Sequence, residues 1–143
     1  MRIILLIFSA IFLFSCSTKS NYESDRREII RILNQQQEDW NKNDLKGFME
    51  GYWNSDSLYF YSGSKLKSGW QSTLESYIKK YPDTSATGNL KFDIAKIAEI
   101  NTDSYFVMGE YHLTRAIGNA HGTFMIIFKR INGQLKIIAD SSC

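Results

Sequence analysis

Residues 47–82 read GFMEGYWNSDSLYFYSGSKLKSGWQSTLESYIKKYP, a stretch that is rich in aromatic side chains and poor in aliphatic ones. The rings are Tyr52, Trp53, Tyr59, Phe60, Tyr61, Trp70, Tyr77 and Tyr81, together with Phe48. A plain core is built mainly from Leu, Ile and Val. Rings with a polar tip suit a cavity wall better, because one end is apolar and the other can hydrogen-bond a ligand. The stretch is therefore predicted to roof a pocket.

Helical patterns lie on both sides of this stretch and inside it. The expected elements are a helix over 24–41, a short helix after Asp44, a short strand over 57–61 and a third helix over 69–80. Ser24 and Ser68 are expected to cap the first and third helices, and Pro82 to end the third. In the first helix, apolar residues recur at helical spacing, and Gln36 lies on the same face.

The second half of the chain reads as strands separated by turns. They are expected over 89–100, 103–115, 120–131 and 134–142. The Asn132-Gly133 pair between two apolar runs is a strong hairpin signal. Helices followed by an antiparallel meander predict an α+β domain, with three N-terminal helices packed on one face of a curved antiparallel sheet. Residues 124–128 are apolar at both parities, so the outer sheet face is also expected to be covered, by a second copy in a homodimer.

The N-terminus has the pattern of an export signal. A positive start precedes an apolar run over 3–14, which is too short to span a bilayer as a helix. The run ends in Leu-Phe-Ser-Cys, which resembles the bacterial lipoprotein box and implies cleavage before Cys16 and lipidation of that residue. The alternative is an ordinary cleaved signal with an incidental cysteine. The expected division is a signal peptide over 1–15, a lipidated cysteine and tether over 16–23, and one domain over 24–143. A membrane-anchored lipoprotein of a Gram-negative bacterium is expected, on the periplasmic side or the cell surface.

Composition excludes several classes of function. The 143 residues carry a formal charge of +2 and 43% hydrophobic residues, which suits one domain with one core. No basic run exceeds two residues, so a nucleic-acid surface is not expected. No P-loop, dinucleotide fingerprint, nucleophile elbow or metal motif occurs, so neither a cofactor nor a metal is expected. Cys143 is expected to have no disulfide partner, since lipid would consume Cys16.

Several segments together resemble a known family. They are WNKNDLKGFMEGYWNSDSLYFYSG (40–63), GW..TLESYIKKYP (69–82), GEYHLTR (109–115), HGTFMIIFKR (121–130) and IIADSS (137–142). The chain is similar to the nuclear transport factor 2-like (SnoaL-like) superfamily. Within it, the chain is most similar to small bacterial proteins of a domain of unknown function near the calcium/calmodulin-kinase association domain. The resemblance implies a cone-shaped fold with a deep pocket and frequent dimers. That subgroup usually closes with Asp-His-Thr/Ser, but here Ser141 follows Asp140, so no acid–base role can rest on that histidine.

Two candidate catalytic residues stand out. Asp140 interrupts an apolar strand, so its carboxyl needs a partner or a raised pKa, and a raised pKa would suit a general base. The preferred alternative is a structural carboxylate bonded to backbone donors or to Arg115. His121 begins a strand next to a glycine and is a second catalytic candidate at the pocket mouth. A neutral histidine at a strand edge is the preferred interpretation of that residue.

The expected ligand site combines aromatic rings with a few polar groups. The predicted ring wall is Trp40, Trp53, Tyr61, Trp70, Tyr77 and Tyr111, and plain core is the alternative for about half of these rings. Gln36 is predicted to orient a ligand through its amide. Arg115 is expected either to pair with Glu110 or to hold an anionic ligand, because a guanidinium grips a carboxylate through two hydrogen bonds. Lys65 and Lys67 are expected to form a solvated hairpin.

Three functions remain open from the sequence. The preferred one is a lipid-anchored domain that binds a small apolar or aromatic molecule, or a protein, without catalysis. The second is an isomerase- or cyclase-type enzyme, in which Asp140 moves a proton and a tyrosine such as Tyr61 or Tyr111 stabilises an oxyanion. The third is a dimerisation scaffold. The fold alone does not choose among them.

Overall fold

The computed structural model describes residues 21–143. The predicted leader and the expected lipidation site Cys16 lie outside the described residues. The helices are α1 (Tyr22–Asn41), α2 (Leu45–Met49), α3 (Trp70–Lys80) and α4 (Thr84–Thr87). The strands are β1 (Tyr59–Ser62), β2 (Lys65–Ser68), β3 (Asn89–Asn101), β4 (Ser104–Thr114), β5 (Ala120–Ile131) and β6 (Gln134–Ser142). Within the described part of the chain, no helix combines the length and apolarity needed to cross a bilayer.

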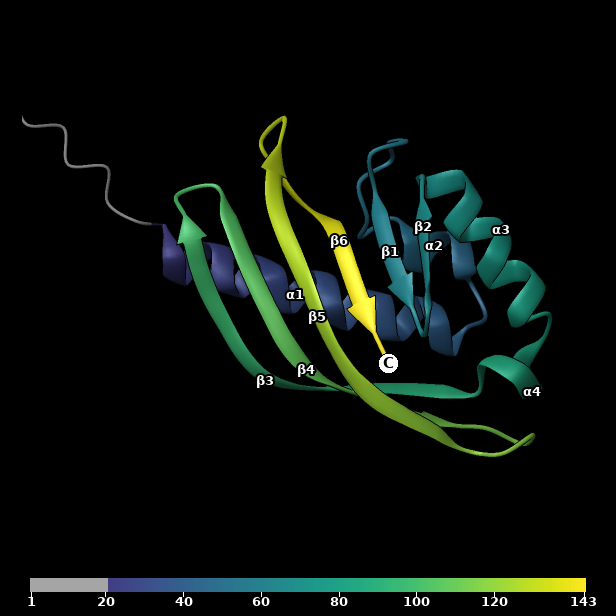
Figure 1. Ribbon diagram of the computed structural model, residues 1–143. Coiled ribbons are helices and arrows are strands. Elements are labelled where there is room, and N and C mark those ends of the chain that lie inside the picture. The colour runs from purple at the N-terminus through teal and green to yellow at the C-terminus, as the bar shows by residue number, and fades with distance from the viewer. Residues whose placement is uncertain (1–20) are drawn as a thin grey trace, which may run out of the picture.

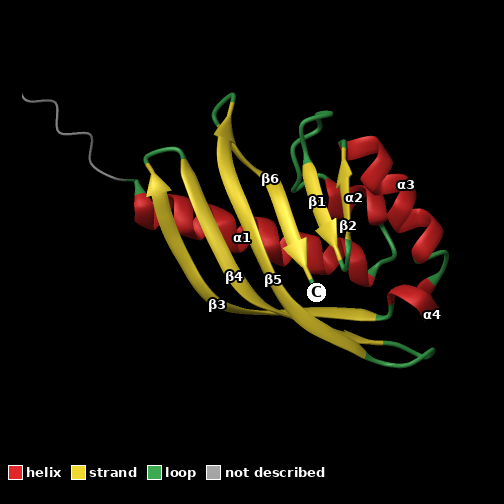
Figure 2. Ribbon diagram, in the orientation of Figure 1, coloured by secondary structure: helices red, strands yellow, loops and turns green. Residues whose placement is uncertain are grey.

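The long helix and the curved sheet form two layers. In Figure 1, α1 crosses the four long strands of the sheet, while α2, α3 and α4 gather near the C-terminal end of α1. Figure 2 shows that the helices lie together on one side of the strands. The predicted α+β class with helices on one face of a curved sheet is therefore confirmed.

The strand order confirms the predicted meander and adds one pairing that the sequence did not indicate. The sheet runs β2-β1-β6-β5-β4-β3, with β1 parallel to β6 and every other pair antiparallel. The sheet is thus mixed rather than purely antiparallel. Asn132 and Gly133 have φ angles of 49° and 82°, the positive values that a tight two-residue hairpin turn requires. Bulges in β3 near Ile94 and in β6 opposite Ile127 interrupt the register. Such bulges bend strands, which helps the sheet wrap around α1.

Helix boundaries differ from the prediction in two places. Helix α1 begins at Tyr22, two residues before the predicted cap. Ser24 therefore lies inside the first turn, and the Ser24 hydroxyl donates to the Asn21 carbonyl oxygen. Helix α3 begins after Gly69, and the carbonyl of Ser68 accepts from the Ser72 hydroxyl instead of Ser68 capping the helix. The short helix α4 was not predicted. Its N-cap is an aspartate, Asp83, whose carboxylate accepts from two backbone amides.

The core lies between α1 and the inner sheet face. The buried residues of α1 include Ile29, Leu33 and Trp40, which recur at helical spacing as predicted. They belong to one hydrophobic cluster with Val107 and Phe128, whose side chains are fully buried in the sheet. Burying an apolar side chain of this size stabilises the fold by roughly 1.5–3 kcal/mol. The core fixes α1 across the concave face, so one end of the cone can remain hollow.

Charged groups pin the N-terminal part of α1 to the sheet. The Asp25 carboxylate lies 2.7 Å from an Nη atom of Arg130 and accepts the Tyr105 hydroxyl at 2.8 Å. Glu28 lies 3.6 Å from the same guanidinium. Asp25 is only 4% exposed, so this carboxylate depends on its partners. Burial would raise its pKa, but the hydrogen bonds from Arg130 and Tyr105 outweigh burial, so the pKa lies below its ordinary value.

The outer face of the sheet carries apolar side chains. Met108 and Met125 lie opposite each other on β4 and β5 and are 46% and 44% exposed. Tyr59 and Tyr61 on β1 are similarly exposed. The homodimer expected through this face stays a prediction, since one chain is described.

Candidate functional site

A cavity of about 430 Å³ opens at the end of the cone where α3 and α4 face the sheet. Its rings come from α1, α2, α3, β1 and the inner face of the meander. They are Trp40, Phe48, Tyr52, Phe60, Tyr77, Tyr81, Phe92, Tyr111 and Phe124. Cavities of this size hold drug-sized ligands, and mostly apolar walls with a few polar groups are typical of ligand sites. The predicted pocket under the aromatic stretch is therefore present.

The aromatic roof is tightly interlocked at its centre. Trp40 meets Phe48, Tyr77 and Tyr81 in edge-on contacts, with ring centroids 4.7–5.8 Å apart. The indole N–H of Trp40 donates to the carbonyl oxygen of Thr87, which ties α1 to α4. Edge-on pairs of this kind each add roughly 0.5–1.5 kcal/mol beyond their area burial. The roof is thus preorganised rather than loosely packed.

Asp140 carries the one side-chain carboxyl group that lines the cavity. It sits on β6 with 7% exposure, and its two oxygens accept from different hydroxyls. Tyr52 donates to Oδ2 at 2.7 Å, and Ser142 donates to Oδ1 at 2.5 Å. Burial raises the pKa of Asp140 from 3.8 to about 6, while the two hydroxyl donors work against this rise. The group is therefore poised to change charge near neutral pH.

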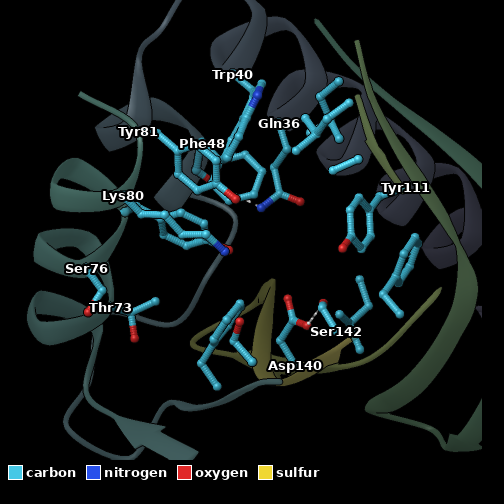
Figure 3. A pocket seen from close by; sticks show the side chains of 18 of the residues that line it. Gln36, Trp40, Phe48, Thr73, Ser76, Lys80, Tyr81, Tyr111, Asp140 and Ser142 are labelled. Carbon is cyan, nitrogen blue, oxygen red and sulfur yellow. Dashed lines mark hydrogen bonds between the residues drawn. The ribbon is translucent and has the colours of Figure 1, made fainter. Parts of the chain in front are cut away.

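Tyrosine hydroxyls surround this carboxyl. Burial raises the pKa of Tyr52 well above 10.0, and the charge of Asp140 raises it further. The pKa of Tyr77 is raised for the same two reasons. Both phenols are therefore neutral hydrogen-bond donors at physiological pH. Figure 3 shows Asp140 and Tyr111 projecting toward one central space, and the Tyr111 hydroxyl donates to the main-chain oxygen of Cys143 at 3.1 Å.

Gln36 lies at the wall of the cavity, as the sequence predicted. Its side chain is 2% exposed, and its amide nitrogen donates to the carbonyl oxygen of Phe48 at 3.0 Å. That bond fixes the orientation of the amide, and its oxygen remains on the cavity side (Figure 3). Gly51 packs against this side chain, because a Cβ there would lie 2.8 Å from the amide nitrogen. The arrangement offers a ligand one fixed acceptor.

The structure places the other predicted residues in two groups. Those at the cavity are Trp40, Tyr77, Tyr111 and Arg115, alongside Gln36 and Asp140. Trp53, Tyr61 and Trp70 do not line it. Trp70 is a core residue whose indole N–H donates to the Met49 carbonyl oxygen at 2.8 Å. Tyr61 is 44% exposed on β1, and Trp53 is joined through its backbone amide to Ile137.

His121 does not lie at the pocket, because strand side chains alternate and its neighbour Ala120 is the one that faces the cavity. His121 is exposed and stacks on His112, with ring centroids 6.4 Å apart. His112 in turn lies 3.2 Å from the exposed carboxylate of Asp93. A catalytic role of His121 in this cavity therefore has no geometric support.

Two further expectations about charges are wrong. Asp140 bonds neither backbone donors nor Arg115, whose Nε instead donates to the Gly118 carbonyl oxygen at 2.8 Å. Glu110 lies near His112 rather than Arg115. Lys67 lies in the expected hairpin, formed by β1 and β2, and it also lines the cavity. Tyr52, one of the rings of the aromatic stretch, also lines it, and so does Lys80, which no pattern in the sequence singled out. Within residues 21–143, no group of His, Cys, Asp and Glu has a metal-binding arrangement.

Comparison with known proteins identifies close structural relatives. No protein-family model matches the chain, and a search of curated proteins finds no match. Among solved structures, an NTF-2-like protein of unknown function from Shewanella oneidensis MR-1 is 34% identical, with a TM-score of 0.80. The alignment covers 82% of this chain and 98% of that one.

More distant structures share the fold. An NTF2-like superfamily protein from Salmonella enterica serovar Typhimurium LT2 is 17% identical with a TM-score of 0.67, over 85% of this chain and 92% of that one. An NTF2-like protein of unknown function from Pseudomonas putida KT2440 is 13% identical with a TM-score of 0.66, over 84% and 86%.

Proposed function

Because this chain belongs to the NTF2-like superfamily, we propose that it is a lipid-anchored domain that binds a small molecule with a flat, apolar body. One observation carries the proposal: a preformed cavity of about 430 Å³ has nine aromatic rings in its wall and a few fixed polar groups. Rings bury large apolar area with little loss of side-chain freedom, so they favour planar ligands. Gln36 and Asp140 supply acceptors that orient a hydroxyl or N–H group of the ligand.

Binding is testable with the neutral dye N-phenyl-1-naphthylamine, whose fluorescence rises in apolar surroundings. The protein would be the full chain with Cys16→Ser, so that neither lipid nor detergent competes for the dye. We expect saturable binding that Ala120→Trp weakens by about tenfold or more, a factor equivalent to about 1.4 kcal/mol. Ala120 is half-buried at the cavity wall, so an indole there occupies the ligand's space.

The matched control is His121→Trp, one residue further along β5 and exposed on the opposite face. It should leave dye binding unchanged. Equal binding by the Ala120→Trp variant and the unmodified cavity would contradict the proposal.

Anchoring rests on the sequence alone. The support is the apolar run over 3–14 that ends in Leu-Phe-Ser-Cys at Cys16, followed by a few polar residues before α1. Several acyl chains on one cysteine give durable membrane attachment, whereas one chain gives only marginal binding. The proposed location is the periplasmic side or the surface of a Gram-negative cell. Growth with a labelled fatty acid is expected to label the unmodified protein and not Cys16→Ser, and label that persists in this variant would rule the anchor out.

A second candidate function is acid–base catalysis of the isomerase or cyclase type. It is favoured by the contact between Asp140 and the Tyr52 hydroxyl within one cavity. A carboxylate with a pKa of about 6 can take a proton from a substrate, and a neighbouring phenol can stabilise the resulting oxyanion by donating a hydrogen bond. Tyr52 and Tyr111 line the cavity, whereas Tyr61 does not. Turnover of a small carbonyl compound that Asp140→Asn abolishes would establish this function, and turnover that survives the substitution would exclude Asp140 as the base.

A further inference from the structure

The mouth of the cavity is ringed by positive charge. The buried lining residues are mainly rings and aliphatic side chains, and the lining side chains that carry positive charge and have solvent access are Lys67, Lys80 and Arg115. They come from three separate elements: Lys67 from β2, Lys80 from the end of α3, and Arg115 from the turn after β4. Positive charge therefore approaches the opening from three sides.

These cations have no anionic partner of their own. Among residues 21–143, the ion pairs involve Lys42, Lys91, His112 and Arg130, and none includes a mouth cation. The single side-chain carboxyl in the lining, Asp140, is buried and already accepts two hydroxyl hydrogen bonds. No side-chain carboxylate of the described residues therefore pairs with the cations at the mouth.

The geometry directs two of these charges at the cavity. Figure 3 shows the Lys80 side chain extending across the roof toward the central space, and its ammonium lies 5.3 Å from the Tyr81 ring centroid. Burial raises the pKa of Tyr111, and the positive charges of Lys80 and Arg115 work against that rise. Both cations therefore act on the same cavity wall. A low-dielectric wall behind them strengthens their field at the opening.

The interior has the opposite character. Gln36 presents an amide oxygen to the interior, and Asp140 presents a carboxyl group. Both groups accept hydrogen bonds from a ligand through their oxygen atoms. An anionic group placed there would face oxygen atoms, whereas at the mouth it would face ammonium and guanidinium groups. The site therefore orients a ligand. The hydrogen-bond donors of the ligand lie inside the cavity, and its anionic group lies at the mouth.

We propose that the cavity binds an organic anion, with its flat apolar body among the rings and its carboxylate, sulfonate or phosphate group held at the mouth by Lys80 and Arg115. This inference rests on the proposed binding function and assigns the chemical class of the ligand. Arg115 suits the role because a guanidinium binds a planar or tetrahedral anion through two hydrogen bonds. Its Nε is held by Gly118, which leaves the terminal nitrogens to a ligand.

A pair of dyes that differ by one charged group tests the inference. 8-Anilinonaphthalene-1-sulfonate carries the same rings and bridging N–H as N-phenyl-1-naphthylamine, with a sulfonate added. Titrated into the full chain with Cys16→Ser, the sulfonate dye is expected to bind about tenfold more tightly. Its sulfonate gains charge-assisted hydrogen bonds at the mouth, and these are stronger than hydrogen bonds between neutral groups. The advantage should shrink as salt rises, since salt screens exposed charges.

Variants assign the advantage to the mouth. Combining Lys80→Gln with Arg115→Gln should remove the preference for the sulfonate dye, so that the affinities of the two dyes lie within about twofold of each other. Lys79→Gln is the matched control, because Lys79 is equally exposed on α3 and does not line the cavity. It should change neither affinity.

The outcomes separate this inference from the proposed function. Equal affinities for the two dyes, or a preference that survives in the double variant, overturn the anion assignment while cavity binding stands. Binding of both dyes that Ala120→Trp does not weaken overturns the cavity as the binding site, and the anion assignment falls with it.

Discussion

Arg130→Met is expected to destabilise the domain by about 3–5 kcal/mol at pH 7, the range seen when one partner of a buried ion pair is removed. Methionine keeps much of the length of the side chain, but it leaves the buried Asp25 carboxylate without a cation, with only the hydroxyls of Tyr105 and Ser24 as donors. Small domains have roughly 5–15 kcal/mol of stability in total. The loss is therefore a large fraction of the whole, and urea unfolding measures it directly.

Three further variants fix the cause. Adding Asp25→Asn to Arg130→Met should recover much of the loss, since it removes the unpaired charge and keeps an acceptor for Tyr105. Tyr105→Phe alone should cost about 1–2 kcal/mol, as expected for one buried hydrogen bond. Arg27→Met replaces an exposed arginine on α1, the helix that carries Asp25. This control should change the free energy of unfolding by less than about 0.5 kcal/mol. A double variant no more stable than Arg130→Met would contradict the account.

The pH dependence of this loss has a defined sign. The folded pKa of Asp25 lies below its ordinary value of 3.8, so the carboxylate contributes stability above that pH and loses it as the pH falls through the folded pKa. The difference between the unmodified protein and Arg130→Met should therefore narrow below about pH 4.

Asp140→Asn is expected to have the opposite effect and to stabilise the domain by about 2–3 kcal/mol at pH 8. The pKa of Asp140 rises from 3.8 to about 6 on folding, so the folded protein holds this proton more tightly than the unfolded chain. One unit corresponds to about 1.36 kcal/mol. Stability is therefore highest while the carboxyl is protonated, and it falls as the pH rises from about 4 to 6. Asparagine keeps an acceptor for Tyr52 and can donate to Ser142.

Urea unfolding at pH 4 and pH 8 measures this effect. The variant should gain little at pH 4 and most at pH 8, whereas Asp93→Asn, at an exposed carboxylate on the outer face, should show no such gain. A variant equally or less stable than the unmodified protein at pH 8 would contradict the assignment. A gain would also show that the native carboxylate is kept at a cost in stability, as expected of a functional group. If Asp140→Asn is the more stable protein, a loss of binding or turnover in this variant cannot result from unfolding.

Much of the fold is predictable because local signals determine it. The Asn132-Gly133 turn, the helical spacing of Ile29 and Leu33, and the run over 120–131 each specify structure through neighbours in sequence. The parallel pairing of β1 with β6 was missed, because residues about 80 positions apart meet there, as Phe60 does with Asp140. No local pattern encodes such a contact.

The site is less predictable, since composition does not say which way a side chain points. Trp70 and Trp40 look alike in sequence, yet each indole N–H has a backbone partner and only Trp40 also faces the cavity. His121 was a candidate for the pocket mouth, but successive side chains of a strand point to opposite faces. Ala120 therefore lines the cavity and His121 does not. Lys67 enters the lining because its hairpin folds back against the roof, which is a tertiary event. Asp140 could be singled out from its apolar strand, but its partner Tyr52 lies 88 residues away.

The ring-lined cavity beside Asp140 is the proposed binding site. The most direct test is a crystal structure of the protein grown with N-phenyl-1-naphthylamine. We expect electron density for the dye between the roof ring of Tyr81 and the wall ring of Phe124, within reach of the Gln36 amide oxygen. An empty cavity, with dye bound only over Met108 and Met125 on the outer sheet face, would contradict the account.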